Sequence, residues 1–543
     1  LTNAQLFEMS VQEYKRNQLM LKLAKGIFEE QSNLDVLVQK IMLEAQDLLK
    51  CQRCSIYLID NTLQGEQNLL LDLHRAKDGD DATAATNPVS PQASIAKITV
   101  QFSGPEDVEF SKAFEIQSEN TKNIINPSAK ELQMSSSAEI AKKVAFAGEV
   151  LNIQDAISDP AFGKEIVDYD GFKITSLLSV PIKNSQDHVL GVVQLMNKVN
   201  GRPFSDSDIN TVQAFAIFCG LGIYNCQMYE DACKLMAKQS VALEVLSYHA
   251  SAPQEETDKL KSAVIANATD WDLLSFDFND FPLTEDETCR ATVRMFLELD
   301  IVNKFHVPYE VLCRWTLSVK KNYRPVTYHN WRHAFNVAQT MFTMLYTGKM
   351  KKYMDDLEMF SMIVACLCHD LDHRGTNNAF QSKASSPLAT LYGTSTMEHH
   401  HFDQCIMILN SEGNNIFMHL SPPDYKKAVK VVESAILSTD LALYFRKKGS
   451  FEKLVKEKNT EWTTSDNKDL LRAMMMTACD VAAITKPWEI QKEVAHLVAS
   501  EFFEQGDLER EQLGETPMAM MDRHKKDELP KMQVGFIDAI CTP

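Results

Sequence analysis

Two histidine motifs in the second half of the chain constrain its structure most strongly. The first reads Tyr-His-Asn-Trp-Arg-His over residues 328–333, and the second reads His-Asp-Leu-Asp-His over residues 369–373. Within each motif two histidines are four residues apart, so on a helix both imidazoles would point the same way. The spacing therefore predicts that the histidines and aspartates of both motifs are offered to one site.

A third segment, Thr-Ala-Cys-Asp over residues 477–480, adds a carboxylate within an apolar stretch. An unpaired charge is costly to bury there, and imidazole with carboxylate is the ligand set of zinc and harder divalent ions. A single histidine among apolar residues is more often a core residue than a ligand. Repeated His-Asp pairs beside Ile363, Val364 and Leu367 are hard to explain by packing, so we interpret the site as that of a metal-dependent phosphohydrolase.

Composition limits the alternatives. A length of 543 residues suits roughly two to four domains, and a formal net charge of −19 argues against a nucleic-acid or anionic-membrane binder. Twelve cysteines scattered singly indicate a reduced, cytoplasmic location. Apolar runs such as residues 359–368 fall short of the roughly 20 residues that cross a bilayer, so no transmembrane segment is expected. Because the chain begins at Leu1 and not at methionine, we expect it to be a piece of a longer protein.

The first half of the chain mixes helical and strand patterns. Polar composition over residues 76–137 predicts a long, partly disordered insertion. We expect two helices within residues 12–49, strands over 54–60, 68–74, 95–102, 177–182 and 189–196, a short helix over 139–147, and a helix capped by 205–208.

These strands, followed by Asn197, Lys198, Phe204 and Asp208, resemble a GAF domain. The resemblance implies an antiparallel sheet with helices, which binds a cyclic nucleotide or mediates dimerisation. The four residues match the motif of the family, whereas Ile209 stands where that motif has glutamate. This departure and the long insertion favour a structural or dimerisation role over a cyclic nucleotide bound in this domain.

A run of residues at alternating spacings of three and four follows the GAF pattern and predicts a coiled-coil linker helix. The run comprises Cys226, Tyr229, Cys233, Met236, Ser240 and Leu243. An amphipathic helix packed on its own domain is the alternative. We expect a homodimer formed through the GAF domain and the linker helix.

The second half closely resembles the catalytic domain of class I 3′,5′-cyclic-nucleotide phosphodiesterases. The resemblance rests on Trp-Arg-His-Ala-Phe-Asn-Val over residues 331–337 and on His-Asp-x-Asp-His-x-Gly-Thr-Asn-Asn over residues 369–378. These motifs are most similar to those of the cyclic-GMP-specific, photoreceptor and dual-specificity (type 11) enzymes, which also carry GAF domains. We favour the dual-specificity type.

The expected organisation is therefore an N-terminal helical segment over residues 1–34, a GAF domain over 35–224, a linker helix over 225–255 and a C-terminally truncated catalytic domain over 256–543. After Asp277 the pattern is nearly all helical. The fold class is an α+β GAF domain joined by a long helix to an all-α domain of the HD type.

The phosphodiesterase resemblance implies that His333, His369, Asp370 and Asp480 bind Zn²⁺, and that Asp370 bridges to a second ion, Mg²⁺ or Mn²⁺. A hydroxide between the two ions would attack phosphorus and give a 5′-monophosphate. His329 matches the general acid of the family, which protonates the departing 3′ oxygen.

Further family positions surround these residues. Glu501 matches the glutamate that orients His329, and His373 and Glu398 match groups around the metal waters. For Glu398, which begins Glu-His-His-His over residues 398–401, a solvated polar patch or an accidental metal-binding run is the alternative.

The resemblance also assigns a nucleotide pocket. Gln533 matches the glutamine that pairs with the purine, because its amide both donates and accepts hydrogen bonds. Phe536 and Val498 match the two sides of an apolar clamp on the ring, with Phe502 beside them, and Tyr328 is included among the substrate-binding residues.

The predicted function is hydrolysis of cAMP and cGMP, regulated through the GAF domain. A cGMP-specific phosphodiesterase is one alternative. A phosphohydrolase of nucleoside triphosphates would need several cationic side chains near the metals, and the motifs offer chiefly Arg332 and Arg374. A catalytically impaired protein that binds cyclic nucleotides or dimerises would lack a ligand, whereas every expected ligand is present.

Overall fold

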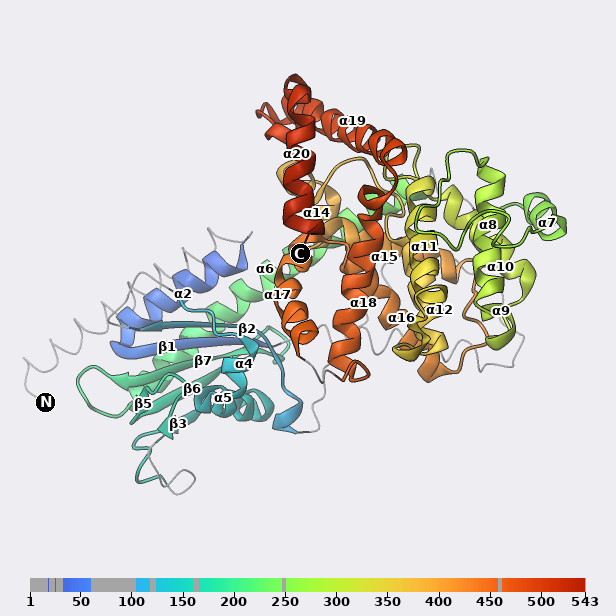
Figure 1. Cartoon of the computed structure of the whole chain (residues 1–543). Helices are drawn as coiled ribbons and strands as arrows, with labels where there is room; N and C mark the ends of the chain where they lie inside the picture. The colour runs from blue at the N-terminus through green and yellow to red at the C-terminus, as the bar shows by residue number, and fades with distance from the viewer. Residues whose placement is uncertain are drawn as a thin grey trace, which may run out of the picture. The chain divides into compact units, whose positions relative to one another are not determined.

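Helix α6 (Asp206–Leu246) belongs to both of the units into which the chain divides, residues 1–232 and 233–543 (Figure 1). The computed structural model describes residues 33–59, 104–117, 124–159, 166–246, 251–457 and 461–542, with the isolated positions 18 and 25. The helix runs without a break through Gly220 and Gly222, so no separate linker helix begins at residue 225.

The N-terminal unit is built on a five-stranded antiparallel sheet with the strand order β2-β1-β7-β6-β3. Its strands are β1 (Cys51–Ile59), β2 (Phe110–Gln117), β3 (Leu151–Ile153), β6 (Leu177–Lys183) and β7 (Val189–Lys198), with β4 (Ile166–Val167) and β5 (Lys173–Ile174) in a separate pair. Its helices, besides the first part of α6, are α2 (Leu34–Leu49), α4 (Ala129–Gln133), α5 (Ser136–Ala147) and the short η2 (Pro105–Asp107).

Strand β1 shows how the sheet divides the core. Because side chains alternate along a strand, Cys54, Ile56 and Leu58 face α2 and the first half of α6, whereas Tyr57 and Ile59 pack with α5. Helices therefore cover both faces of the sheet, and the α+β prediction for this unit is confirmed.

Part of the predicted insertion is ordered. Strand β2, which lies within residues 76–137, pairs with β1 and buries Phe114 and Ile116. The strand was not recognised from composition, because Ser111 and Lys112 in its first half are polar residues exposed at the edge of the sheet. The strands predicted over 68–74 and 95–102 lie outside the described residues.

The motif residues of the GAF pattern stabilise the end of β7. The Asn197 side chain, at a backbone φ of 51°, accepts hydrogen bonds from the Thr175 and Ser176 amides. Lys198 Nζ lies 2.8 Å from a carboxylate oxygen of Asp208, which also accepts from the Ser205 amide at the start of α6. These contacts tie β7 to α6.

The C-terminal unit is all-helical, as predicted. Beyond the end of α6 its helices are α7 (Gln254–Ser262), α8 (Glu285–Glu298), α9 (Ile301–Lys304), α10 (Tyr309–Lys321), α11 (Trp331–Tyr346), α12 (Asp356–Cys368), α13 (Asn378–Lys383), α14 (Pro387–Leu391), α15 (Thr396–Asn410), α16 (Pro422–Leu437), α17 (Leu441–Lys456), α18 (Ser465–Asp480), α19 (Trp488–Leu513) and α20 (Leu529–Phe536). Short turns of helix are η4 (Met350–Lys352), η5 (Ala482–Thr485), η6 (Ala519–Met521), η7 (Arg523–Glu528) and η8 (Ile537–Cys541).

Helix α12 lies at the centre of this unit, and every one of its residues after Asp356 is buried. Helices α11, α16 and α18 pack around it. Edge-to-face rings from four different segments, Phe296, Trp315, Phe360 and Phe417, fix the packing on one side. The ends of α11, α12 and α18 are thereby held in place.

The long helix α6 has two further properties. By length and composition it is the one described helix that could cross a membrane, but half of its most apolar window is buried inside the protein, as in a core helix. Cys226, predicted on the coiled-coil seam, is instead fully buried in the GAF core. Tyr229, Met236 and Leu243, which are seven residues apart, are more than half exposed.

A buried charged cluster lies inside the GAF unit. Arg53 is 1% exposed, with Nε 2.9 Å from Glu115 and a second nitrogen 3.6 Å from Asp168, and it also pairs with Asp170. Burial raises the pKa of Glu115, and Arg53 opposes that rise. The cluster is therefore held together by the single guanidinium group.

Replacing Arg53 by methionine is expected to destabilise the GAF unit by about 3–5 kcal/mol, because three carboxylates would lose their buried partner. Hydrogen exchange of the whole chain, followed by mass spectrometry, should show faster exchange in β1 and α5. Peptides from α11 and α12 serve as an internal reference. The matched control is Lys112→Met, which removes an exposed pair with Asp35; equal exchange in both variants would contradict the structural role of Arg53.

Candidate metal centre

The histidine motifs lie at helix ends. Asn330 caps α11 by accepting a hydrogen bond from the Arg332 amide, so His333 is in the first turn while His329 precedes the helix. Helix α12 stops before His369, and residues 369–373 form a turn. The prediction that each histidine pair lies on one helix is therefore wrong. The turn forms because Asp372 adopts a left-handed conformation, with a φ of 60°.

Four side chains meet in spite of this. His333 Nε2 lies 3.1 Å from His369 Nε2, 3.0 Å from Asp480 Oδ1 and 3.5 Å from Asp370 Oδ2. His369 Nε2 lies 3.2 Å from Asp370 Oδ2 and 3.3 Å from Asp480 Oδ1. Ligand atoms about 2.0–2.1 Å from a tetrahedral Zn²⁺ are about 3.3 Å from one another. The separations therefore fit a single tetrahedrally coordinated metal ion held by these four residues.

The charges of the four groups also favour a bound metal ion. No lysine or arginine in the described residues forms an ion pair with Asp370 or Asp480. Burial would raise the pKa of both carboxyls, but the adjacent imidazoles hold it well below the usual range. A divalent ion at this point would supply positive charge to both buried carboxylates.

Asp370 faces a second group with its other oxygen. Its Oδ1 lies 3.5 Å from Nε2 of His401, and the potential ligand atoms of Asp370, His373 and His401 all lie within 4.8 Å of one another. The carboxylate thus presents one oxygen to each of two clusters, which is the arrangement of a residue that bridges two ions.

The remaining ring nitrogens have partners that orient the histidines. His369 Nδ1 lies 2.8 Å from the Cys366 carbonyl and His401 Nδ1 lies 2.6 Å from the Leu371 carbonyl. Each ring therefore donates from Nδ1 and turns Nε2 toward the carboxylates. His400 and His401 were not identified as site residues from the sequence, although the spacing of three residues between Glu398 and His401 was a signal.

Glu501 on α19 holds His329. One of its oxygens pairs with His329 Nδ1, and the other accepts hydrogen bonds of 2.7 and 3.0 Å from the amides of Tyr328 and His329. Although burial opposes the change, the His329 ring lowers the pKa of Glu501 to about 2. Burial lowers and the Glu501 bond raises the pKa of His329, with a net rise.

His373 and Glu398 take different places. The His373 ring lies 4.2 Å from that of His329, and its Nδ1 accepts a hydrogen bond from the Gly375 amide. Burial and the nearby His329 lower the pKa of His373 to about 3. Glu398 accepts a hydrogen bond of 2.9 Å from Asn378, and burial raises its pKa to about 7.

Asp372 points away from the metal cluster. Its carboxylate accepts a hydrogen bond of 2.6 Å from Arg324 Nε and lies 2.7 Å from His400 Nε2. The prediction that both aspartates of the second motif serve the site directly is therefore wrong for Asp372. Sequence spacing could not show this, because the left-handed residue reverses the direction of the side chain.

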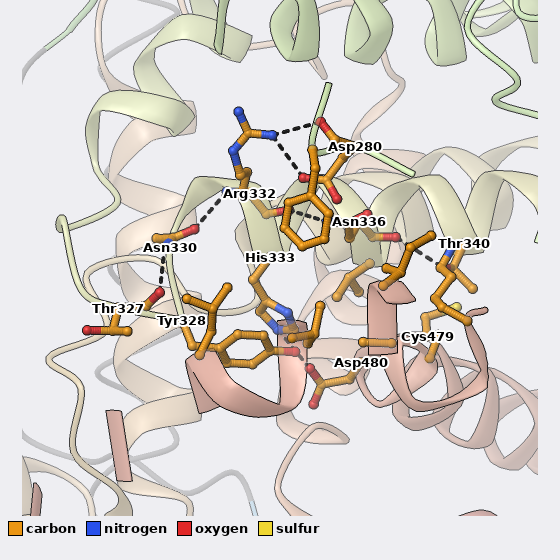
Figure 2. Close-up of a pocket in the computed structure, with 18 residues that line it drawn as sticks. Asp280, Thr327, Tyr328, Asn330, Arg332, His333, Asn336, Thr340, Cys479 and Asp480 are labelled. Atoms are coloured by element: carbon orange, nitrogen blue, oxygen red, sulfur yellow. Dashed lines mark hydrogen bonds and ion pairs between the residues drawn. The ribbon is translucent and has the colours of Figure 1, made fainter. Parts of the chain in front are cut away.

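A cavity of about 190 Å³ adjoins the cluster and opens between α11, α18 and α19. Figure 2 shows Tyr328 and His333 beside Asp480 at one wall and the paired Arg332 and Asp280 at another. Ile490, Val494 and Leu497 of α19 complete the lining, so the cavity is apolar on the side away from the cluster.

The predicted nucleotide-binding residues lie on two helices. Val498 and Phe502 are half-buried on α19, one turn apart and on the face that carries Glu501. Gln533 and Phe536 are half-buried on α20. No hydrogen bond or ring contact within the described residues joins the two pairs.

The fold and the site together define a class of protein in which an α+β domain is followed by an all-helical domain with a His–Asp metal cluster. Residues 328–543 match the sequence profile of the 3′5′-cyclic nucleotide phosphodiesterase family, and residues 33–223 match that of the GAF domain. The chain therefore combines a GAF domain with a domain of the cyclic nucleotide phosphodiesterase family.

Several relatives align with the whole of this chain. A cGMP-specific 3′,5′-cyclic phosphodiesterase of Drosophila melanogaster is 58% identical over 545 residues, which cover 48% of that protein. Proteins of the same name from Drosophila virilis and Drosophila ananassae are 56% and 54% identical, with 60% and 49% of their lengths covered. The chain thus spans about half the length of the curated relatives it matches.

Changing Asp480 to asparagine is expected to remove most of the divalent metal, with zinc as the probe, from the cluster, because one of the four ligands loses its charge. Elemental analysis of purified protein measures this directly, and a chelator should lower the unfolding temperature of the wild type more than that of the variant. Asp507→Asn, at an exposed pair with Arg523, is the matched control. Equal zinc in wild type and Asp480→Asn would rule out this ligand set.

Proposed function

We propose that this chain hydrolyses 3′,5′-cyclic nucleotides to 5′-monophosphates in cyclic-nucleotide signalling, with two divalent ions at the His–Asp cluster. The observation that supports this most strongly is the set of separations of 3.0–3.5 Å among His333, His369, Asp370 and Asp480. The names of the relatives, which are phosphodiesterases, support the same reaction.

The donor set suggests the ions. Imidazole-rich coordination by His333 and His369 with two carboxylates suits Zn²⁺, whereas the position at the other oxygen of Asp370 suits Mg²⁺ or Mn²⁺. When bound, such ions lower the pKa of water and neutralise charge on the phosphoryl oxygens.

His329 is proposed as the general acid that protonates the departing 3′ oxygen. Glu501 occupies its Nδ1, so Nε2 is the nitrogen that delivers the proton. The negative charge of Glu501 favours the protonated imidazole, which agrees with the raised pKa of His329. Glu501 also fixes the backbone of residues 328 and 329, so the ring is held before substrate arrives.

The nucleotide base is proposed to bind between α19 and α20. Val498 and Phe502 provide an apolar wall next to Glu501, and Phe536 provides the opposing ring. The amide of Gln533 can pair with adenine or guanine because it both donates and accepts. Tyr328 is proposed to contact the substrate next to the metal cluster, since its ring lies 4.6 Å from that of His333.

Replacing His329 by alanine is expected to reduce kcat for cyclic nucleotides by about 10²–10⁴-fold, the usual contribution of a general acid. Hydrolysis of bis(4-nitrophenyl) phosphate should fall far less, because 4-nitrophenolate leaves without a proton. Glu501→Gln should show the same difference between substrates to a smaller degree. An equal loss on both substrates would contradict the acid role.

Substrate choice is the finer part of the proposal. We propose that both cAMP and cGMP are hydrolysed. The proposal rests on the resemblance to dual-specificity enzymes and on the amide of Gln533, which can both donate and accept hydrogen bonds. The relatives are named cGMP-specific, which favours cGMP as the better substrate.

Assays of cAMP and cGMP side by side, with the metal-loaded chain and Asp480→Ala as control, test this choice. Comparable turnover of both nucleotides, lost in the control, is the expected result. Turnover of cGMP alone would establish the cGMP-specific alternative. Failure with both, in folded protein with bound metal, would exclude the enzyme proposal for this chain.

For the GAF domain we propose a regulatory role through structure and dimerisation. Two large buried polar side chains of its sheet already have partners within the domain, since Arg53 binds three carboxylates and the Tyr57 hydroxyl bonds to Ser137. A second copy would cover the exposed Tyr229, Met236 and Leu243 of α6. The free cysteines support a cytoplasmic location, and the net charge of −19 argues against nucleic acid as a partner.

A further inference from the structure

The last turn of α6 contacts the second histidine motif through a charged cluster. Glu244 Oε1 lies 3.1 Å from a terminal nitrogen of Arg324, and its Oε2 lies 3.1 Å from a terminal nitrogen of Arg374. Both guanidinium groups also face Asp372, at 2.6 Å from Arg324 and 3.7 Å from Arg374. Two carboxylates therefore balance two guanidinium groups.

The position of Asp372 in this cluster affects the neighbouring residues of the metal site. It lies two residues after Asp370 and directly before His373, and its left-handed backbone is a conformation that surrounding contacts must maintain. Those contacts are the side-chain bonds to Arg324 and His400 and a hydrogen bond of 3.1 Å from its amide to the Asn322 carbonyl. Displacement of Asp372 would therefore turn Asp370.

Because of Arg374, the charge balance of the cluster depends on Glu244. Its Nε and one terminal nitrogen are buried without a well-aligned hydrogen bond. Among the described residues Glu244 and Asp372 are its ion-pair partners. Without Glu244, Arg374 would retain the ion pair with Asp372, which also binds Arg324, and the uncompensated charge of Arg374 would act on the turn that carries Asp370.

Apolar contacts hold the same helical turn in place. Val241 and Val245, one turn apart on α6, are buried against Leu388 of α14 and Met397 of α15. Met397 directly precedes Glu398 in the helix that also carries His400 and His401. The end of α6 thus contacts both sequence segments that surround Asp370.

We propose that Glu244 is a positioning residue that sets the affinity of the second ion site, formed around Asp370 Oδ1, by holding Asp372. The proposal rests on the proposed metal-dependent function. Because α6 begins at Asp206 in the GAF unit, movement of this one helix would change the affinity of that site, and metal occupancy would report the state of the GAF unit.

The test measures Mn²⁺ binding to the whole chain from the loss of the free Mn²⁺ spin-resonance signal, which does not depend on catalysis. Glu244→Gln is expected to weaken Mn²⁺ binding by about tenfold, the lower end for groups that orient metal ligands. Zinc content should stay at the wild-type level. Glu256→Gln, which removes an ion pair between α7 and Lys321 of α10, is the matched control and should bind Mn²⁺ as the wild type does.

A double variant separates positioning from a general loss of structure. If Glu244 acts by neutralising Arg374, then Glu244→Gln combined with Arg374→Gln should bind Mn²⁺ more tightly than Glu244→Gln alone. Unchanged Mn²⁺ affinity in Glu244→Gln would overturn the proposal, and so would loss of zinc along with Mn²⁺. Simple addition of the effects of Glu244→Gln and Arg374→Gln on Mn²⁺ affinity in the double variant would overturn it as well. Absence of cyclic-nucleotide hydrolysis in the wild type would leave the binding comparison valid, so the two proposals fail separately.

Discussion

The burial of Asp370 and Asp480 beside two imidazoles is the interaction on which the C-terminal unit depends. Both carboxylates stand at the C-terminal ends of helices, since Asp480 closes α18 and Asp370 follows the end of α12. Helix C-termini carry partial negative charge, which adds to that of the carboxylates. A cation at this buried point would offset both contributions, so the packing of α11, α12 and α18 also determines how strongly the site attracts a metal ion.

The histidine rings of the site are also held in position by groups of the protein. Four of the rings have one nitrogen fixed by a group of the protein: His369 and His401 by backbone carbonyls, His373 by a backbone amide, and His329 by a carboxylate. The second nitrogen of each ring is thereby aimed before any ligand binds. Preorganised dipoles of this kind contribute to catalysis because they need no rearrangement when charge develops.

Sequence reasoning predicted the residue types of the site and the class of each unit, but not the local backbone. Spacing of four residues correctly brought His369 and His373 to one region, yet it assumed a helix where the left-handed Asp372 makes a turn. A period in the sequence shows which side chains share a face and does not show where the helix ends. Strand β2 was missed for a related reason, since exposed Ser111 and Lys112 gave it the composition of a loop. His401 was visible in the sequence, but only its contact with Asp370 distinguishes it from a surface histidine.

Helix α6 shows how the regulatory and metal-binding parts of the chain depend on one element. Between Cys226 and Ala237 none of its side chains is buried, although Met228, Tyr229, Leu235 and Met236 are apolar and well exposed. These ten residues, about 15 Å of helix, are too few to form a stable helix in water by themselves. Their order must come from the packed turns at both ends or from a second chain on the apolar face. Either source of order would stiffen α6 as far as Glu244. If Glu244 holds Asp372 as we propose, an event that loosens or covers the middle of α6 would act on the turn beside Asp370 without a new contact at the metal site.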